Sequence, residues 1–227
     1  MIAHSAAMTE RNISLVILCG GGSRRMGFPK HLIRLGGTTI IEHLAVGLGA
    51  RFDEVLVVGS DLPPALPHRI RRVGDLLPMQ NPLVGIYSGL TAAINDLCFV
   101  LACDMPYVMP PLVDVIVRSI QEADVAVPVV SGHFEPLCAA YRRAVIPAAR
   151  QTLDSRDYKV TALYEHIRVQ KVHETALRIA DPDLQSFINI NTKRELAALS
   201  AETPFLRGPG SGDEPLRLKC AQELPNP

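Results

Sequence analysis

Short, uninterrupted apolar runs recur along the first two thirds of the chain. The runs at residues 13–19, 54–59 and 98–103 are mostly apolar and are bounded by glycine or aspartate, and the first two are rich in β-branched residues. Such runs are typical of parallel strands that are buried on both faces. A more polar run at 69–73 and an apolar one at 124–130 predict two further strands.

Helical patterns lie between these runs. Residues 39–50 begin with Thr-Ile-Ile-Glu, the form of a capping box, and then place apolar residues at spacings of three and four. The same spacing predicts helices over 82–97 and, after a Pro-Pro pair, over 112–122. Gly85 and Gly89 in the second of these helices mark a face where backbones or a ligand come close.

The order strand, helix, strand, strand, helix, strand, helix, strand predicts an α/β fold with an open, mostly parallel central sheet. Ligands bind such sheets at the carboxyl ends of the strands. The second half is less regular, with strands expected at 135–142 and 167–172 and helices at 145–153, 160–166 and 192–200. We expect one domain over residues 13–202, a flexible N-terminus over 1–12, and a disordered tail over 203–227, which is rich in proline, glycine and charge.

Composition narrows the class of protein. The 227 residues are 48% hydrophobic and 20% charged, as in an ordinary globular domain. Lysine plus arginine and aspartate plus glutamate both number 23, so net charge gives no support to a nucleic-acid or anionic-membrane partner. Five cysteines form no C-x-x-C pair, and no segment has the pattern of a signal peptide or the length of a membrane span. We therefore expect a cytoplasmic protein, with Met1 or Met8 as its start.

The segment after the first strand combines backbone freedom with positive charge. Residues 20–22 are glycines, which leave backbone N–H groups open to an anion or a purine edge. Arg25 and Lys30 supply charge for phosphate groups, and Arg24 either joins them or is solvated. The spacing fits neither the dinucleotide fingerprint, because Arg25 replaces the third glycine, nor the P-loop, because Phe-Pro replaces its lysine and hydroxyl residue. The alternative is a plain glycine-rich turn with exposed basic residues.

This segment also carries a family resemblance. Leu18-Cys19-Gly20-Gly21-x-x-x-Arg25-Met26-Gly27-x-x-Lys30 resembles the signature loop of the nucleotidyltransferases related to molybdenum cofactor guanylyltransferase. Other segments resemble that family in the same order: Leu35-Gly36-Gly37 with Ile40-Ile41-Glu42-His43, Gly74-Asp75, Pro82-Leu83-Val84-Gly85-Ile86, Ala102-Cys103-Asp104-Met105-Pro106-Tyr107 and Phe187-Ile188-Asn189-Ile190-Asn191-Thr192. The sequence departs from the pattern at Cys19, which replaces the usual alanine, at Pro29, which replaces an aspartate, and at Thr38-Thr39, which replace Lys-Pro.

The resemblance covers about residues 13–200 and implies a three-layer, Rossmann-like nucleotidyltransferase fold. It implies an Mg²⁺-dependent enzyme that transfers GMP from GTP to the phosphate of molybdopterin, and proteins that donate or accept the cofactor are implied partners. Carried over residue by residue, it assigns three roles. The catalytic residues are Arg25, Lys30 and Asp104, and Asp104 binds the metal. The nucleotide-binding residues are Leu18, Gly20, Gly21, Lys30, Asp75 and Asp104. The residues on the pterin side are Asn189 and Asn191.

The residues themselves allow these roles and also plainer ones. Asp104 ends a buried strand, where a single carboxylate suits Mg²⁺ held mainly by substrate phosphates, but aspartate also caps turns. Asp75 offers a hydrogen-bond acceptor to guanine or ribose, or is a turn residue. Asn189 and Asn191 would share one face of a strand, although Asn191 also suits a helix cap. A phosphate nucleophile is already ionised at pH 7, so no catalytic base is required.

Two features point to different nucleotides. The glycines of residues 20–22 follow the guanylyltransferase pattern and leave room for a purine, whereas Pro29 follows that of the related cytidylyltransferases. We expect GTP to be preferred, because the glycines bear directly on the base and Pro29 lies beside the phosphate lysine. The alternatives are a CTP-dependent molybdopterin cytidylyltransferase and a nucleotide-binding domain without catalysis.

Overall fold

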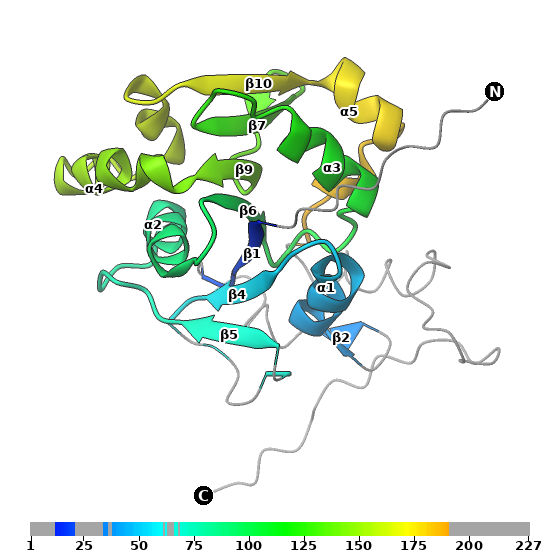
Figure 1. Ribbon diagram of the computed structural model, residues 1–227, viewed down its shortest axis with the longest axis horizontal. Coiled ribbons are helices and arrows are strands. Elements are labelled where there is room, and N and C mark those ends of the chain that lie inside the picture. Colours follow the sequence, from blue (N-terminus) through cyan, green and yellow to red (C-terminus); the bar gives the residue numbers. More distant parts are fainter. Residues whose placement is uncertain are drawn as a thin grey trace, which may run out of the picture.

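The computed structural model describes residues 12–20, 34–35, 38–60, 62, 66–67 and 69–190. Its centre is an eight-stranded sheet with the strand order β10-β7-β9-β6-β1-β4-β5, and β8 pairs with β7 (Figure 1). The strands are β1 (Ile13–Leu18), β4 (Glu54–Val58), β5 (Ile70–Val73), β6 (Leu97–Ala102), β7 (Val125–Val130), β8 (His133–Phe134), β9 (Cys138–Arg142) and β10 (Val169–His173). A separate antiparallel pair is formed by β2 (Arg34–Leu35) and β3 (Thr38–Thr39).

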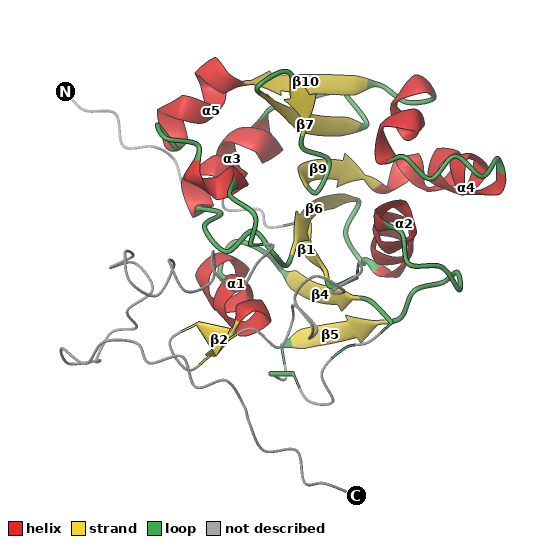
Figure 2. Ribbon diagram, turned by 180° about the vertical axis from the view of Figure 1, so that it is seen from behind, coloured by secondary structure: helices red, strands yellow, loops and turns green. Residues whose placement is uncertain are grey.

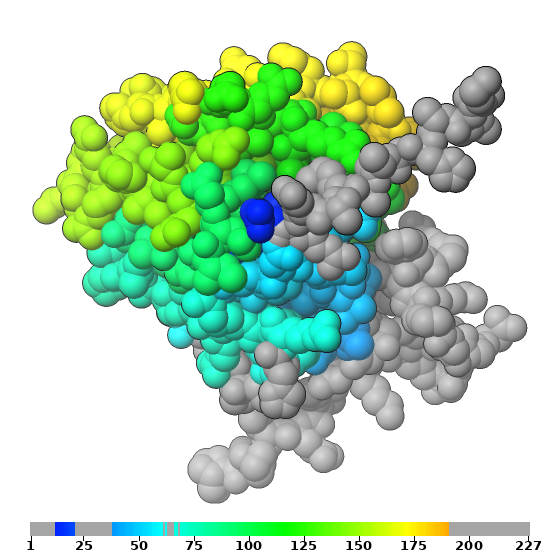
Figure 3. Space-filling view, in the orientation of Figure 1, coloured from blue at the N-terminus to red at the C-terminus, as the bar shows by residue number. Residues whose placement is uncertain are grey.

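The sheet is mostly parallel, as predicted. β1 is parallel to both β4 and β6, β4 is parallel to β5, and β10 is parallel to β7. β9 lies between β6 and β7 and is antiparallel to both. The carboxyl ends of β5, β4, β1 and β6 therefore meet at one edge of the sheet. Figure 3 shows cyan β5 and yellow β10 toward opposite sides of the molecule, as their places at the two ends of the strand order require.

Helices cover both faces of the sheet and confirm the three-layer fold (Figures 1 and 2). Two hydrophobic cores result, and β1 contributes to both by alternation: Leu15 and Ile17 belong to one core and Val16 and Leu18 to the other. The first core holds α1 (Ile40–Gly49), α3 (Pro110–Arg118) and α5 (Glu174–Ala180). The second holds α2 (Pro82–Ala92), α4 (Ile146–Asp154) and the 3₁₀ helices η3 (Arg143–Val145) and η4 (Val160–Glu165).

The predicted capping box is present at the start of α1. The hydroxyl of Thr39 accepts a hydrogen bond from the amide of Glu42 at 3.2 Å, and the Glu42 carboxylate accepts one from the amide of Thr39 at 2.7 Å. These two bonds satisfy backbone donors that have no partner within the helix. The prediction of a helix over residues 39–50 is confirmed.

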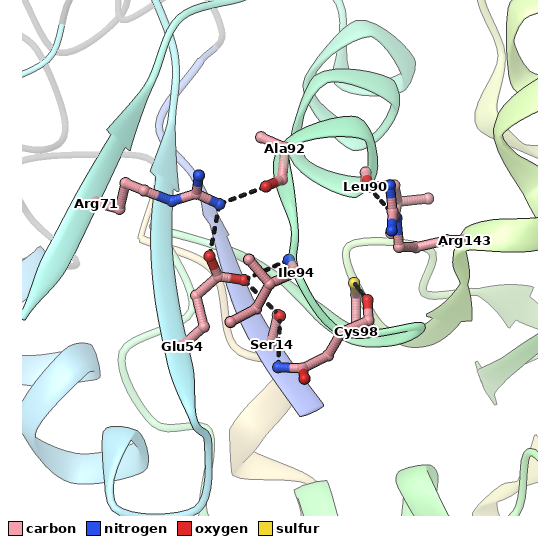
Figure 4. Close-up of polar contacts among 9 residues, drawn as sticks. Ser14, Glu54, Arg71, Leu90, Ala92, Ile94, Cys98 and Arg143 are labelled. Carbon is pink, nitrogen blue, oxygen red and sulfur yellow. Dashed lines mark hydrogen bonds and ion pairs between the residues drawn. The ribbon is translucent and has the colours of Figure 1, made fainter. Parts of the chain in front are cut away.

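The second helix ends at Ala92, five residues before its predicted end at residue 97. The apolar spacing continues to Ile94, but this side chain is 67% exposed. Its amide donates to the carboxylate of Glu54 on β4 at 2.9 Å, so it takes no part in the helix (Figure 4). A tertiary hydrogen bond therefore ends α2 where the periodicity would extend it.

Gly85 and Gly89 lie where α2 packs closely on β1. A Cβ atom on Gly89 would overlap the side chain of Val16, and one on Gly85 would lie 3.3 Å from Cδ2 of Leu18. The close approach predicted for this face is therefore between the backbone of α2 and side chains of the sheet.

Several predictions in the second half of the chain need correction. The strand predicted over 135–142 begins at Cys138, and the helix predicted over 160–166 is the 3₁₀ helix η4. The helix α5 was not predicted, because seven residues carry too little periodicity. The segment before Asn189 contains a 3₁₀ turn, η5 (Gln185–Phe187), and Asn189 itself lies in irregular backbone, so the predicted strand alternation is wrong at this residue.

The helix predicted over 192–200, the tail over 203–227 and all of the predicted N-terminal segment except residue 12 lie outside the described residues. Among the helices that are described, none has the length and apolar character needed to cross a membrane.

Candidate functional site

The backbone at the carboxyl edge of the sheet stays paired beyond the strand ends. The amide of Cys19 donates to the carbonyl of Val58 at 2.7 Å, and the amide of Cys103 donates to the carbonyl of Leu18 at 3.0 Å. The amide of Gly59 donates to the carbonyl of Val73 at 3.0 Å. These bonds fix the starting points of four neighbouring loops. They therefore place Gly20, Asp75 and Asp104 along one edge.

Gly59 is required for this arrangement. A Cβ atom at this position would lie 2.6 Å from the carbonyl oxygen of Cys19, which is closer than two such atoms can approach. The sequence marks Gly59 only as the end of an apolar run. Its role depends on the neighbouring strand, which the local sequence does not reveal.

Leu18 is the last residue of β1, and Gly20 follows it by two residues. The side chain of Leu18 is buried against Gly85 of α2, and its carbonyl accepts the hydrogen bond from Cys103. Gly20 is exposed, and no atom of the other described residues lies within 4 Å of a Cβ built on it. Open backbone at the head of the glycine segment is consistent with the predicted nucleotide contact.

Asp104 is half-buried in the turn that follows β6. The pKa of the Cys19 thiol is raised well above its ordinary value, first by the hydrogen bond with Cys103, then by burial, and further by the negative charge of Asp104. The Asp104 carboxylate therefore lies close to the residue that precedes the glycine segment. The backbone of the turn is fixed by a hydrogen bond from the amide of Met105 to the carbonyl of Ala102 at 3.3 Å.

Asp75 is half-buried beyond the end of β5. Burial raises the pKa of its carboxyl group, and a hydrogen bond from the backbone amide of Ser60 acts in the opposite direction. The next residue, Leu76, donates its amide to the hydroxyl of Ser88 at 2.9 Å, and this buried hydroxyl donates to the carbonyl of Val84 at 2.7 Å. Helix α2 thus anchors the backbone next to Asp75, a contact that the sequence did not indicate.

Asn189 is exposed and belongs to the same neighbourhood as Asp104. The amide of the next residue, Ile190, donates to the carbonyl of Asp104 at 2.8 Å. The structure thus brings together Leu18, Gly20, Asp75, Asp104 and Asn189 from distant parts of the sequence. Four further predicted site residues lie outside the described residues: Gly21, Arg25, Lys30 and Asn191.

One carboxylate of the edge suits a hard cation. Within the described residues, no group of three or more His, Cys, Asp or Glu side chains is arranged to hold a metal ion. This excludes a complete protein cage within that part of the chain. The donor set does fit Mg²⁺, which usually takes one or two carboxylates and completes its shell with substrate phosphates and water.

His43 is a residue of this region to which the sequence assigned no contact. Its Nε2 atom lies 3.2 Å from the carbonyl oxygen of Pro106, two residues after Asp104. Because a carbonyl oxygen can only accept, Nε2 must carry the proton. Burial lowers the pKa of His43, and the hydrogen bond to Pro106 opposes that shift.

The fold has three layers, with helices on both faces of the sheet, and acidic and glycine residues follow the carboxyl ends of its parallel strands. These features define an α/β protein of the open-sheet, ligand-binding class. The family model of the MobA-like NTP transferase domain matches residues 15–172. The chain belongs to this family.

Named relatives agree with this assignment. A probable molybdenum cofactor guanylyltransferase of Pelotomaculum thermopropionicum is 38% identical over 182 residues, 80% of this chain and 88% of the relative. One of Natranaerobius thermophilus is 35% identical over 196 residues, 83% of this chain and 95% of the relative. Among solved structures, molybdopterin-guanine dinucleotide biosynthesis protein A of Archaeoglobus fulgidus superposes with a TM-score of 0.72 at 26% identity and covers 82% of this chain and 96% of its own.

Proposed function

We propose that this protein transfers GMP from GTP to the terminal phosphate of molybdopterin and releases pyrophosphate. The product is a guanine dinucleotide form of the molybdenum cofactor. The observation that carries this proposal is the juxtaposition of Gly20, Asp75, Asp104 and Asn189 at one edge, in a chain whose relatives are named for this activity.

The reaction needs positioning more than acid-base chemistry. A bond forms between an acceptor phosphate oxygen and the α-phosphorus of GTP, and the bond from that phosphorus to the bridging oxygen of pyrophosphate breaks. The attacking phosphate is ionised at neutral pH, so the protein's task is to align the two substrates and to offset their negative charge. This explains why the described part of the site offers carboxylates and backbone but no paired nucleophile and base.

Asp104 is the residue proposed to hold Mg²⁺. When bound, the ion neutralises charge on the phosphates of GTP. Arg25 and Lys30 are proposed to add positive charge around the same phosphates, on the strength of their match to the family signature. Gly20 and Gly21 are proposed to contribute backbone N–H groups.

Asp75 is proposed to read the base. Its carboxylate can accept hydrogen bonds from both N1–H and the 2-amino group of guanine, a pair of donors that cytosine does not present. A polar site that is left unpaired by the wrong base costs about 1–3 kcal/mol, which corresponds to a preference of roughly tenfold or more.

The proposal is tested by measuring pyrophosphate release with molybdopterin and Mg²⁺, with GTP, CTP and ATP in competition. We expect kcat/KM for GTP to exceed that for CTP and ATP by at least roughly tenfold. A win for CTP would move the protein to the cytidylyl branch, and absence of turnover with all three would leave a binding domain without catalysis. Asp75→Asn keeps the side-chain volume but replaces an acceptor by a donor, so the preference for GTP should shrink in this variant.

The proposal extends to the cellular location of the protein and to its protein partners. We infer a cytoplasmic location, which is supported by the four described cysteines, all of them free thiols. Proteins that donate or accept the molybdenum cofactor are the proposed macromolecular partners.

A further inference from the structure

A buried hydroxyl connects the segment before Asn189 to the turn after Asp104. The side chain of Ser186, in η5, is fully buried at 0% exposure. Its oxygen accepts a hydrogen bond from the amide of Met109 and donates one to the carbonyl of Tyr107, both at 3.3 Å. These partners are 77 and 79 residues away in the sequence, so the contact joins two separate parts of the chain.

Asp181 fixes the turn that carries this hydroxyl. Its side chain is 2% exposed, and its carboxylate accepts hydrogen bonds from the amides of Gln185 at 3.1 Å and Ser186 at 2.8 Å. The turn needs this support because Leu184 has a φ of 53°, in the left-handed region that leucine rarely adopts. Burying a carboxylate is costly unless it is hydrogen-bonded, and the two amides offset that cost.

A second attachment lies four residues further along the chain. The amide of Ile190 donates to the carbonyl of Asp104 at 2.8 Å. The residues between Ser186 and Ile190 are thus tethered at both ends to the loop that begins with Asp104. Asn189 is exposed within this short span, so its position is determined by the two attachments.

We propose that Ser186 is a positioning residue for the acceptor substrate. With Asp181, it holds Asn189 at a fixed place beside Asp104, so that a heterocyclic phosphate bound at Asn189 meets the nucleotide held at Asp104. The inference rests on the proposed function and on the family resemblance, which places Asn189 on the pterin side of the site. The nucleotide side should depend less on Ser186, since the start of its turn is also fixed by the hydrogen bond of Cys103 to Leu18 of β1 and by that of Met105 to Ala102.

The first test is Ser186→Ala in the full chain, with pyrophosphate release as the assay. We expect KM for molybdopterin to rise at least about fivefold while KM for GTP stays within about twofold, the loss that one hydrogen bond explains. Thr152→Val is the matched control, because its buried hydroxyl donates to the carbonyl of Ala148 at 2.9 Å on the opposite face of the sheet. A lower melting temperature with both KM values unchanged would show that Ser186 is merely structural and would overturn the proposal.

The second test is a double-mutant cycle between Ser186→Ala and Asn189→Ala. If Ser186 acts through Asn189, the double variant should have the same KM for molybdopterin as Asn189→Ala alone. If the two substitutions instead raised KM for molybdopterin by factors that multiply in the double variant, the proposal would be contradicted.

Amide hydrogen exchange gives a readout that does not depend on activity. In Ser186→Ala, the amide of Ile190 should exchange faster while that of Cys103 keeps its protection. Unchanged exchange at Ile190 would refute the coupling. If the wild-type protein released no pyrophosphate with molybdopterin, the proposed function would fail, and the exchange measurement would still decide whether the two segments are coupled.

Discussion

The residues that end each strand decide what the carboxyl edge can bind. Asp104 and Asp75 follow two strands of the same parallel group, and both are half-buried. Partial burial limits hydration of a carboxylate and so strengthens its interaction with a cation or a donor. A change of charge at either residue should therefore affect ligands more than folding.

Asp104→Asn should reduce nucleotidyl transfer by at least about a hundredfold, because the amide keeps the volume but loses the anionic metal ligand. The measurement is the rate of pyrophosphate release at saturating GTP and Mg²⁺, with circular dichroism to verify the fold. Turnover at the wild-type rate would show that Asp104 does not serve the metal.

His43 should make stability depend on pH. Its folded-state pKa is lowered from 6.5 by burial, so below that pH the unfolded chain binds a proton that the native state resists. Stability contributed by neutral His43 is therefore complete above pH 6.5 and is lost as pH falls toward the folded pKa.

His43→Gln keeps an N–H donor for Pro106 but does not titrate. The difference in melting temperature between wild type and this variant should decrease as pH falls from about 7.5 to about 5. A difference that stays constant over this range would contradict the role of His43.

Candidate site residues can be chosen from the sequence where a local pattern points to them. Asp75 and Asp104 follow predicted strands, as the glycines do, and their roles remain predictions. Ser88, Asp181 and Ser186 were not predictable, because their roles come from hydrogen bonds to segments 12 or more residues away or to a turn without periodicity.

At the scale of elements, a polar network at the amino-terminal edge of the sheet joins β1, β4, β5 and α2 (Figure 4). The carboxylate of Glu54 accepts hydrogen bonds from the hydroxyl of Ser14 at 2.6 Å, the amide of Ile94 at 2.9 Å and the guanidinium of Arg71 at 2.5 Å. Arg71 also donates to the carbonyl of Ala92 at the end of α2. One carboxylate therefore satisfies donors from β1, from β5 and from the loop after α2, far from the site.

Glu54→Ala should lower the free energy of unfolding by about 2–4 kcal/mol, since it leaves three donors without their acceptor. The measurement is chemical denaturation, and the exposed Glu165→Ala serves as a control with a change of less than about 0.5 kcal/mol. Equal stability of the two variants would mean that water replaces the carboxylate without loss.

Strands and helices of the first half were predictable because uniform apolar runs and helical spacing report burial directly. The antiparallel direction of β9 was not predictable, because it depends on the two strands between which β9 is inserted, β6 and β7. The early end of α2 was missed because Glu54, 40 residues earlier, accepts the hydrogen bond of Ile94.

At the scale of the whole molecule, two cores close the sheet on both faces within the described residues. Phe205, Leu206, Leu216 and Leu218 in the tail have no sustained period. Deleting residues 203–227 should therefore leave the melting temperature within about 2 °C, as differential scanning calorimetry would show. A loss of many degrees would mean that these residues pack on the domain.

The reversed direction of β9 has a consequence for how new acceptors could be accommodated. In a wholly parallel sheet, the loop that enters a strand lies at the edge away from the ligand. Because β9 is antiparallel, the segment that enters it, residues 131–137 including β8, lies at the ligand edge, where the carbonyl of Leu137 accepts a hydrogen bond from the amide of Ala102 at 2.8 Å. Exchanging this segment between family members while keeping Phe134 and Leu137, which pack against the cores, would change the ligand edge beside β6 and leave the other strands in place. It is therefore the natural graft point for altering acceptor choice.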